Sequence, residues 1–149
     1  MSNGLTRYVM GLMLSPDLLN VVLLRKNRPA FLAGLLNGVG GKIEPGESPV
    51  FAMSREFKEE ADLDVAQSAW ISLGHSTGPG YEIFFFYTLD SRYNQVRTMT
   101  DEPVQPYPRA MLGPDVHYEI FEMLAFIDKA VSTGSDGADQ KSENSVEVR

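Results

Sequence analysis

The chain of 149 residues has no cysteine, which excludes disulfide bonds and thiolate chemistry. This absence is compatible with a reducing cytoplasm, and we expect the protein to be located there. No apolar run approaches the roughly 20 residues that a membrane-spanning helix needs. The most apolar stretch, IFFFYTL at 83–89, has the length of a strand. The N-terminus MSNGLTRYVMG lacks a basic segment followed by a cleavable apolar segment, so no secretory signal is expected.

Positive charge is scarce as well: 13 Lys and Arg stand against 20 Asp and Glu, a net charge of −7. Binding to long nucleic acid depends on clustered cations, so this balance argues against such partners. A small phosphorylated ligand stays compatible, because a bound divalent cation reverses the local field. We therefore expect a small-molecule partner and neither nucleic acid nor membrane, while nothing in the sequence predicts an oligomeric state.

With 43% hydrophobic residues, the chain has the composition of a globular protein. Its length predicts one domain with a real core, which we assign to residues 1–132. The last stretch, 133–149, has no aromatic residue and few apolar ones. We expect this tail to be disordered.

Two pairs of strands are predicted. The first pair spans 6–14 and 18–25 and is separated by the turn sequence Ser-Pro-Asp. The second pair spans 70–76 and 81–89, joined by Thr-Gly-Pro-Gly. Residues 91–113 look mostly irregular, with one short strand near 96–99.

Two helices are also predicted. The first begins at Pro49 with Ser48 as its cap and runs to about Ala61. The second spans about 114–131, where apolar residues recur at helical spacing and Asp115 is a candidate cap. Strand pairs around a central helix, with another helix at the end, predict a layered α/β or α+β domain.

The first helix carries an unusual set of charges. One stripe of it is apolar and would pack on a sheet, made of Val50, Met53, Phe57 and Ala61. Glu56, Glu59 and Glu60 gather on the adjacent face, where like charges repel and where the helix dipole favours cations. A solvated acidic face would explain this cluster, since Arg55 and Lys58 offset part of the repulsion. A hard divalent cation, Mg²⁺ or Mn²⁺, would resolve both conflicts.

The residues around this helix resemble the signature box of the Nudix hydrolases, G-x5-E-x7-R-E-U-x-E-E-x-G-U, in which U is bulky and apolar. Gly41, Glu47, Arg55-Glu56-Phe57 and Glu59-Glu60 stand at the spacing of the box, and Leu63 fills its last position. The final glycine of the box is Asp62 here. This departure predicts a left-handed helix end that Asp tolerates less well than Gly.

The resemblance implies an α/β/α sandwich with a mixed sheet between helices, and it implies a role for each residue of the box. Glu56, Glu59 and Glu60 would bind the metal ions, and one of them would help to activate water. Arg55 would pair with Glu47 and orient the carboxylates. The carbonyl of Gly40 would be a further ligand, and Gly41 would let the backbone come close.

Outside the box, Glu102 resembles the extra glutamate that many relatives bring from a later loop as metal ligand or general base. Asp101 competes with it for this role. Glu44, inside the glycine-rich loop, is expected to be solvated. The activity implied is metal-dependent hydrolysis of a nucleoside diphosphate linked to another group.

Substrate markers favour the MutT-like branch, which acts on oxidised purine nucleoside triphosphates. Asn37 in the run Asn-Gly-Val-Gly-Gly-Lys would read a purine edge, Lys42 would contact substrate, and Asp115 matches a base-recognition Pro-Asp. Gly113 and Val116 depart from that pattern, which weakens 8-oxo-dGTP as the specific substrate.

Three alternatives remain. Pro79 lies sixteen residues beyond the box, as in ADP-ribose hydrolases, and Tyr81 lies eighteen beyond, as in some dinucleoside polyphosphate hydrolases. A hairpin turn explains both residues without function. The third alternative is a non-catalytic nucleotide-binding module, although such modules usually have a degenerate box.

Overall fold

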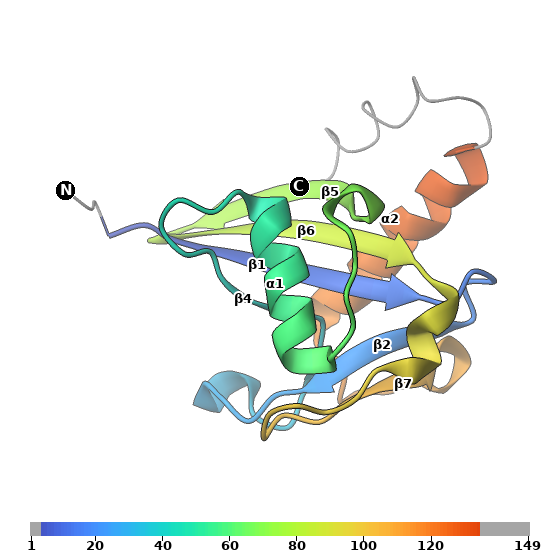
Figure 1. The fold of residues 1–149 in the computed structure, drawn as a ribbon. Helices are drawn as coiled ribbons and strands as arrows, with labels where there is room; N and C mark the ends of the chain where they lie inside the picture. Colours follow the sequence, from blue (N-terminus) through green and yellow to red (C-terminus); the bar gives the residue numbers. More distant parts are fainter. Residues whose placement is uncertain (1–3, 135–149) are drawn as a thin grey trace.

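A mixed β-sheet lies between two helices, α1 on one face and α2 on the other (Figure 1). The computed structural model describes residues 4–134. This arrangement is the predicted α/β/α sandwich. Within the described range, no helix is long and apolar enough to cross a membrane.

In the part of the chain that the structure describes, the sheet has seven strands, with the order β3-β2-β1-β6-β5 along its main path. Their bounds are Thr6–Leu14 (β1), Asn20–Arg25 (β2), Leu36–Asn37 (β3), Val39–Lys42 (β4), Ile71–Gly78 (β5), Tyr81–Leu89 (β6) and Val104–Pro108 (β7). The β1–β6 pair is parallel, and every other pair is antiparallel. β4 also pairs with β1, and β7 with β2. The two predicted strand pairs, β1–β2 and β5–β6, are therefore confirmed.

Helix α1 spans Pro49–Ala61, as predicted. The Ser48 hydroxyl accepts the backbone N–H of Phe51 at 3.2 Å, which satisfies an orphan donor of the first turn. At the other end Asp62 is left-handed, with φ 60° and ψ 40°, and its N–H reaches the Lys58 carbonyl. Both ends of the helix are thus set by local sequence.

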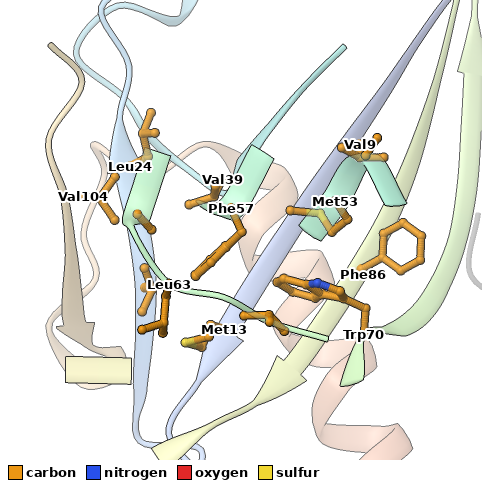
Figure 2. Close-up of a cluster of buried hydrophobic side chains, with 14 residues drawn as sticks. Val9, Met13, Leu24, Val39, Met53, Phe57, Leu63, Trp70, Phe86 and Val104 are labelled. Carbon is orange, nitrogen blue, oxygen red and sulfur yellow. The ribbon is translucent and has the colours of Figure 1, made fainter. Parts of the chain in front are cut away.

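The apolar stripe of α1 packs into a core on its side of the sheet (Figure 2). Met53, Phe57 and Ala61 are fully buried there, and the rings of Phe57 and Trp70 pack edge-to-face with 5.5 Å between their centroids. On the opposite face α2 buries Ile120, Met123, Leu124 and Ile127 in a second core. Two separate cores therefore hold the two helices against one sheet.

The predicted strand at 96–99 is wrong. The strand of this region is β7, and its prolines, Pro106 and Pro108, lie opposite Val22 and Asn20 of β2. Proline cannot donate to a ladder and is tolerated on edge strands, so β7 carries no ordinary strand signal. Val96 instead packs its side chain against the core of α1.

Helix α2 spans Tyr118–Gly134 and therefore begins four residues later than predicted. Residues 114–117 form a turn and a single bridge to Leu36, whose N–H donates to the Asp115 carbonyl and whose carbonyl accepts from His117. Asp115 is thus a bridging residue and not the helix cap. Residues 133 and 134 of the predicted tail close α2, and the rest of that tail lies outside the described residues.

Four short 3₁₀ helices complete the described chain: Ala30–Leu32, Gln67–Ala69, Ser91–Gln95 and Arg109–Met111. The glycine-rich segment 35–42, for which no strand was predicted, supplies β3 and β4. β4 pairs with β1 and places Gly41 opposite Val9, which belongs to the core of α1. Gly41 therefore faces α1.

Candidate active site

The glycines of β4 bring the backbone against α1. A Cβ on Gly41 would lie about 2.5 Å from the carboxylate of Glu56. A Cβ on Gly40 would lie 1.9 Å from the Val9 carbonyl oxygen. A side chain on Gly41 would force β4 away from α1, and one on Gly40 would force β4 away from β1, so both glycines are required by space. The predicted ligand role of the Gly40 carbonyl stays a prediction.

Arg55 lies at the centre of the site and forms the ion pair with Glu47 that the sequence predicts. Its Nε donates to Glu47 Oε2 at 2.5 Å and its Nη2 to Oε1 at 2.9 Å. The same Nη2 donates to the Lys42 carbonyl at 3.0 Å, which ties α1 to the end of β4. The guanidinium lowers the pKa of Glu47. A bidentate pair of this kind fixes the orientation of the arginine.

Glu56 and Glu59 are turned toward the same arginine. Arg55 Nη1 donates to Glu56 Oε2 at 3.0 Å and to Glu59 Oε1 at 3.2 Å. Glu56 is buried, and burial raises its pKa although Arg55 acts in the opposite direction. The Glu59 side chain is 55% exposed. One carboxylate is therefore held firmly and the other is free to turn.

Glu60 has one carboxylate oxygen without a partner in the described residues. Its Oε1 is buried and accepts no hydrogen bond within residues 4–134. Burial raises the pKa of Glu60 to about 8, and the charge of Glu56 adds to this, while Lys26 and the Gly40 backbone oppose it. A buried, unpartnered carboxylate oxygen costs free energy unless something absent from the chain bonds it.

The donor set fits a hard divalent cation, because Glu60 offers an unsatisfied oxygen beside Glu56. Within residues 4–134, no three Asp, Glu or His side chains already stand as a ready set of metal ligands. The reason is visible in the contacts: Arg55 holds Glu56 and Glu59 in ion pairs. The predicted ligand role of Glu59 stays a prediction, since its exposed side chain would have to turn from Arg55 toward the cation.

Glu102 is placed differently from a free ligand or base. It is only 4% exposed, and its Oε2 accepts the backbone N–H of Asn27 at 2.6 Å. Its Oε1 lies 3.4 Å from Lys26 Nζ. Asp101, its competitor, is exposed and pairs with Arg28. The predicted catalytic role of Glu102 stays a prediction.

The predicted substrate contacts lie on neighbouring segments. Asn37 is buried, its Oδ1 accepts the N–H of Gly38 at 2.9 Å, and no other described residue bonds its Nδ2. Asn37 lies opposite Leu24 of β2 and so shares the α1 face of the sheet with it. The Asp115 carboxylate contacts Arg25 at 3.1 Å. The Lys42 side chain is exposed at the end of β4.

Sequence reasoning did not single out Lys26. It follows β2 directly, contacts Glu102, and its charge acts on Glu60. A signal was available, because Arg25, Lys26 and Arg28 concentrate three of the 13 cations of an acidic chain within four positions.

Comparison with known proteins identifies a family for this chain and solved structures of similar fold. A family model described as the NUDIX domain matches residues 5–112. No curated protein matches the chain.

Three solved structures are similar in fold. A MutT from work on Aliivibrio salmonicida and Vibrio cholerae is 22% identical, with a TM-score of 0.60, and the match covers 71% of this chain and 82% of that one. A MutT/nudix family protein from Enterococcus faecalis is 18% identical (TM-score 0.70; 89% and 64% covered). A MutT NUDIX hydrolase from Burkholderia pseudomallei is 14% identical (TM-score 0.67; 81% and 96% covered).

Proposed function

The chain belongs to the Nudix family of hydrolases, and we propose that its substrate is a nucleoside triphosphate, cleaved to the monophosphate and diphosphate. Hydrolases of this family generally use divalent metal ions and act on small nucleotides. The single observation that carries the proposal is the buried, unpartnered Oε1 of Glu60 on the carboxylate face of α1. Such an oxygen is what a cation bound to a phosphate chain requires.

Glu56, Glu59 and Glu60 would hold the cation, for which we propose Mg²⁺, with Mn²⁺ as a substitute. When bound, the cation supplies neutralisation of the phosphate charge and acidification of water. Arg55 and Glu47 keep Glu56 oriented through their shared hydrogen bonds. A carboxylate of this cluster accepts the proton of the attacking water.

Asn37 supports a purine base over a pyrimidine. Its Nδ2 is a free donor beside an otherwise buried strand, and its Oδ1 keeps the amide oriented through Gly38. An amide held in this way reads a base edge by hydrogen bonding. Val116 is buried and lies against Leu36, and its apolar side chain offers no acceptor for a second contact with the base. The proposal is therefore a purine nucleotide, with 8-oxo-dGTP as one candidate and not the only one.

The test is a panel of dNTPs, 8-oxo-dGTP, ADP-ribose and dinucleoside polyphosphates with Mg²⁺ or Mn²⁺, compared by kcat/KM. Release of monophosphate and diphosphate from purine triphosphates at the highest kcat/KM supports the proposal. If ADP-ribose or a dinucleoside polyphosphate is turned over with the highest kcat/KM, that compound replaces the nucleoside triphosphate as the proposed substrate. Binding of nucleotide without metal-dependent hydrolysis of any compound would make the protein a non-catalytic module.

A further inference from the structure

Helix α2 is apolar on the side that faces solvent as well as on the side that faces the sheet. Ile120, Leu124 and Ile127 are buried in the second core. On the opposite side of the same helix, Tyr118 is 65% exposed and Phe121 is 46% exposed. A helix that is apolar all round is typical of a buried position. The outward face of α2 therefore has the composition of an interface.

Helix α1 provides the contrast within the same protein. Two of the three exposed positions of α1 are charged: Lys58 and Glu59. Four of the seven exposed positions of α2 are apolar or aromatic: Tyr118, Phe121, Ala125 and Phe126. These four residues, together with Glu122 and Lys129, are called the α2 face below. Exposed apolar side chains that are grouped on one surface mark a contact site for another molecule.

The charges of the α2 face are complementary to those of a second copy. Glu122 and Lys129 are seven residues apart, so they lie on one side of the helix, about 10 Å apart along its axis. A two-fold axis that crosses α2 between Ala125 and Phe126 lies midway between them. This axis turns a second α2 antiparallel and brings Glu122 of each copy to the level of Lys129 of the other. One set of charges therefore gives two ion pairs in a dimer.

The neighbouring charges do not oppose this pairing. Within residues 4–134, neither Glu122 nor Lys129 forms an ion pair, so both are available to a second copy. Asp128, the acidic residue beside Lys129, already accepts two hydrogen bonds from Arg109, at 2.9 and 2.8 Å. Its charge is therefore compensated within its own chain.

The sizes of the side chains also fit two antiparallel helices in contact. Ala125 lies beside the two-fold axis, and its methyl group lets the helix axes approach to about 8 Å. At each end of the contact, the ring of Tyr118 comes to the level of Ser132 of the second copy. A large side chain thus meets a small one, as packed helices require.

We propose that the protein forms a homodimer through the α2 face, with two copies of α2 packed antiparallel about a two-fold axis beside Ala125. The sheet separates this face from α1, so the carboxylates of the candidate active site lie outside the interface in both copies (Figure 1). Dimerisation through this face does not depend on the proposed substrate. An anionic lipid surface is a poorer match, because α2 has three acidic residues and only one basic residue.

Sedimentation velocity of the full chain tests the dimer. The mass should move from 16.5 kDa toward twice that value as the concentration of protein rises. A series from about 1 to 200 μM covers the dissociation constants of a modest interface. A chain that stays at 16.5 kDa throughout overturns the proposal, whether or not α2 then binds phospholipid vesicles.

Exchange of the two charges tests the antiparallel register. Glu122→Lys and Lys129→Glu should each raise the dissociation constant of the dimer about tenfold, because each variant places two pairs of like charges in the interface. The double variant Glu122→Lys/Lys129→Glu restores both ion pairs, so its dissociation constant should return to within about threefold of the wild type. Additive losses in the double variant would overturn the proposal.

The matched control for this exchange is Glu44→Lys, which makes the same change of charge in the exposed loop before α1. The dissociation constant of this variant should stay within about threefold of the wild type. A tenfold weaker dimer in Glu44→Lys would mean that the α2 face is not where the copies meet. A thermal melt of each variant checks that it is folded.

A cysteine introduced beside the axis gives a readout of position. The chain has no cysteine of its own. Ala125→Cys places one thiol of each copy beside the two-fold axis, where a disulfide with about 5.5 Å between Cα atoms can form. Ala66→Cys, at an exposed alanine outside the α2 face, should be cross-linked by oxidation at least about tenfold more slowly. Equal rates for the two variants would show chance collision and contradict an interface at α2.

Discussion

Arg55 donates two hydrogen bonds to Glu47, from Nε to Oε2 at 2.5 Å and from Nη2 to Oε1 at 2.9 Å. Glu47 is in the loop before α1 and Arg55 is in the second turn of it, so the pair closes the loop onto the helix. With Nε and Nη2 held in this way, Nη1 is the atom that reaches Glu56 and Glu59. The orientation of the carboxylate face therefore depends on a residue that is not part of it.

Substitution of Glu47 by Gln should lower kcat about 10- to 100-fold without unfolding the protein, because Arg55 loses its ionic partner and shifts among the carboxylates. Steady-state kinetics measures kcat for each variant, and a thermal melt checks that the variant is folded. Glu44→Gln is the matched control, because Glu44 is exposed in the same loop. Equal losses in the two variants would contradict the orienting role of the pair.

Glu59→Gln and Glu60→Gln should each reduce kcat by about 10²-fold or more, because each removes a charged oxygen from the cation site. The melting temperature of Glu59→Gln should stay close to that of the wild type, since its side chain is exposed. Glu122→Gln on the exposed face of α2 provides the control. Near-full activity in both site variants would remove the metal assignment.

Asp62→Gly should stabilise the protein by about 1 kcal/mol with activity unchanged, because a non-glycine residue at φ 60° is strained and glycine is not. The ion pairs of Asp62 with Lys58 and Arg97, at 3.4 and 3.6 Å, involve exposed cations and offset little of this gain. Urea unfolding measures the difference. The control is Asp62→Ala, which keeps the backbone strain and loses the ion pairs, so it should not be more stable than the wild type. If Asp62→Gly is less stable than the wild type, the left-handed cap is not strained.

The pKa of Glu60, raised to about 8 from an ordinary 4.5, predicts a pH-dependent stability in the absence of metal. The folded state holds this proton more tightly than the unfolded state, so stability from this group is present below pH 4.5 and is lost as pH rises toward 8. Glu60→Gln imitates the protonated form and should become more stable than the wild type by about 2 kcal/mol at pH 8, since part of the side chain remains in water.

Urea unfolding in EDTA from pH 5 to pH 8.5 gives the free energy of unfolding of the wild type and of Glu60→Gln. The difference between these two free energies at each pH is the readout. Carboxylates distant from Glu60 titrate alike in both proteins and cancel. Saturating Mg²⁺ should reverse the sign at pH 8, because the wild type binds the cation better. A difference that does not change with pH would show that Glu60 ionises normally.

Asn37→Ala should reduce kcat/KM for purine triphosphates about tenfold more than for pyrimidine triphosphates, because the free Nδ2 donor is lost. The control is Glu122→Gln on the exposed face of α2, which should leave the ratio between purine and pyrimidine triphosphates unchanged. Equal loss for all bases in Asn37→Ala would mean that this residue supports the strand and does not read the base.

Local signals in the sequence determined much of the molecule. The bounds of α1 follow from Ser48, Pro49 and Asp62, because a helix cap and a left-handed residue act through their own backbone neighbours. The spacing from Gly41 to Glu60 predicted the carboxylate face, since residues three and four apart share one side of a helix. These features need no knowledge of distant parts of the chain.

Tertiary structure alone decided the rest. β7 is a strand because β2 pairs with it, despite two prolines. Asp115 lies before α2 and does not cap it, because its carbonyl accepts the N–H of Leu36. Glu102 is buried and accepts the N–H of Asn27, a residue 75 positions earlier, so no local pattern could predict this contact. Hydrogen bonds between distant segments form only when the sheet is assembled, and they determine which of several equivalent carboxylates is left without a partner.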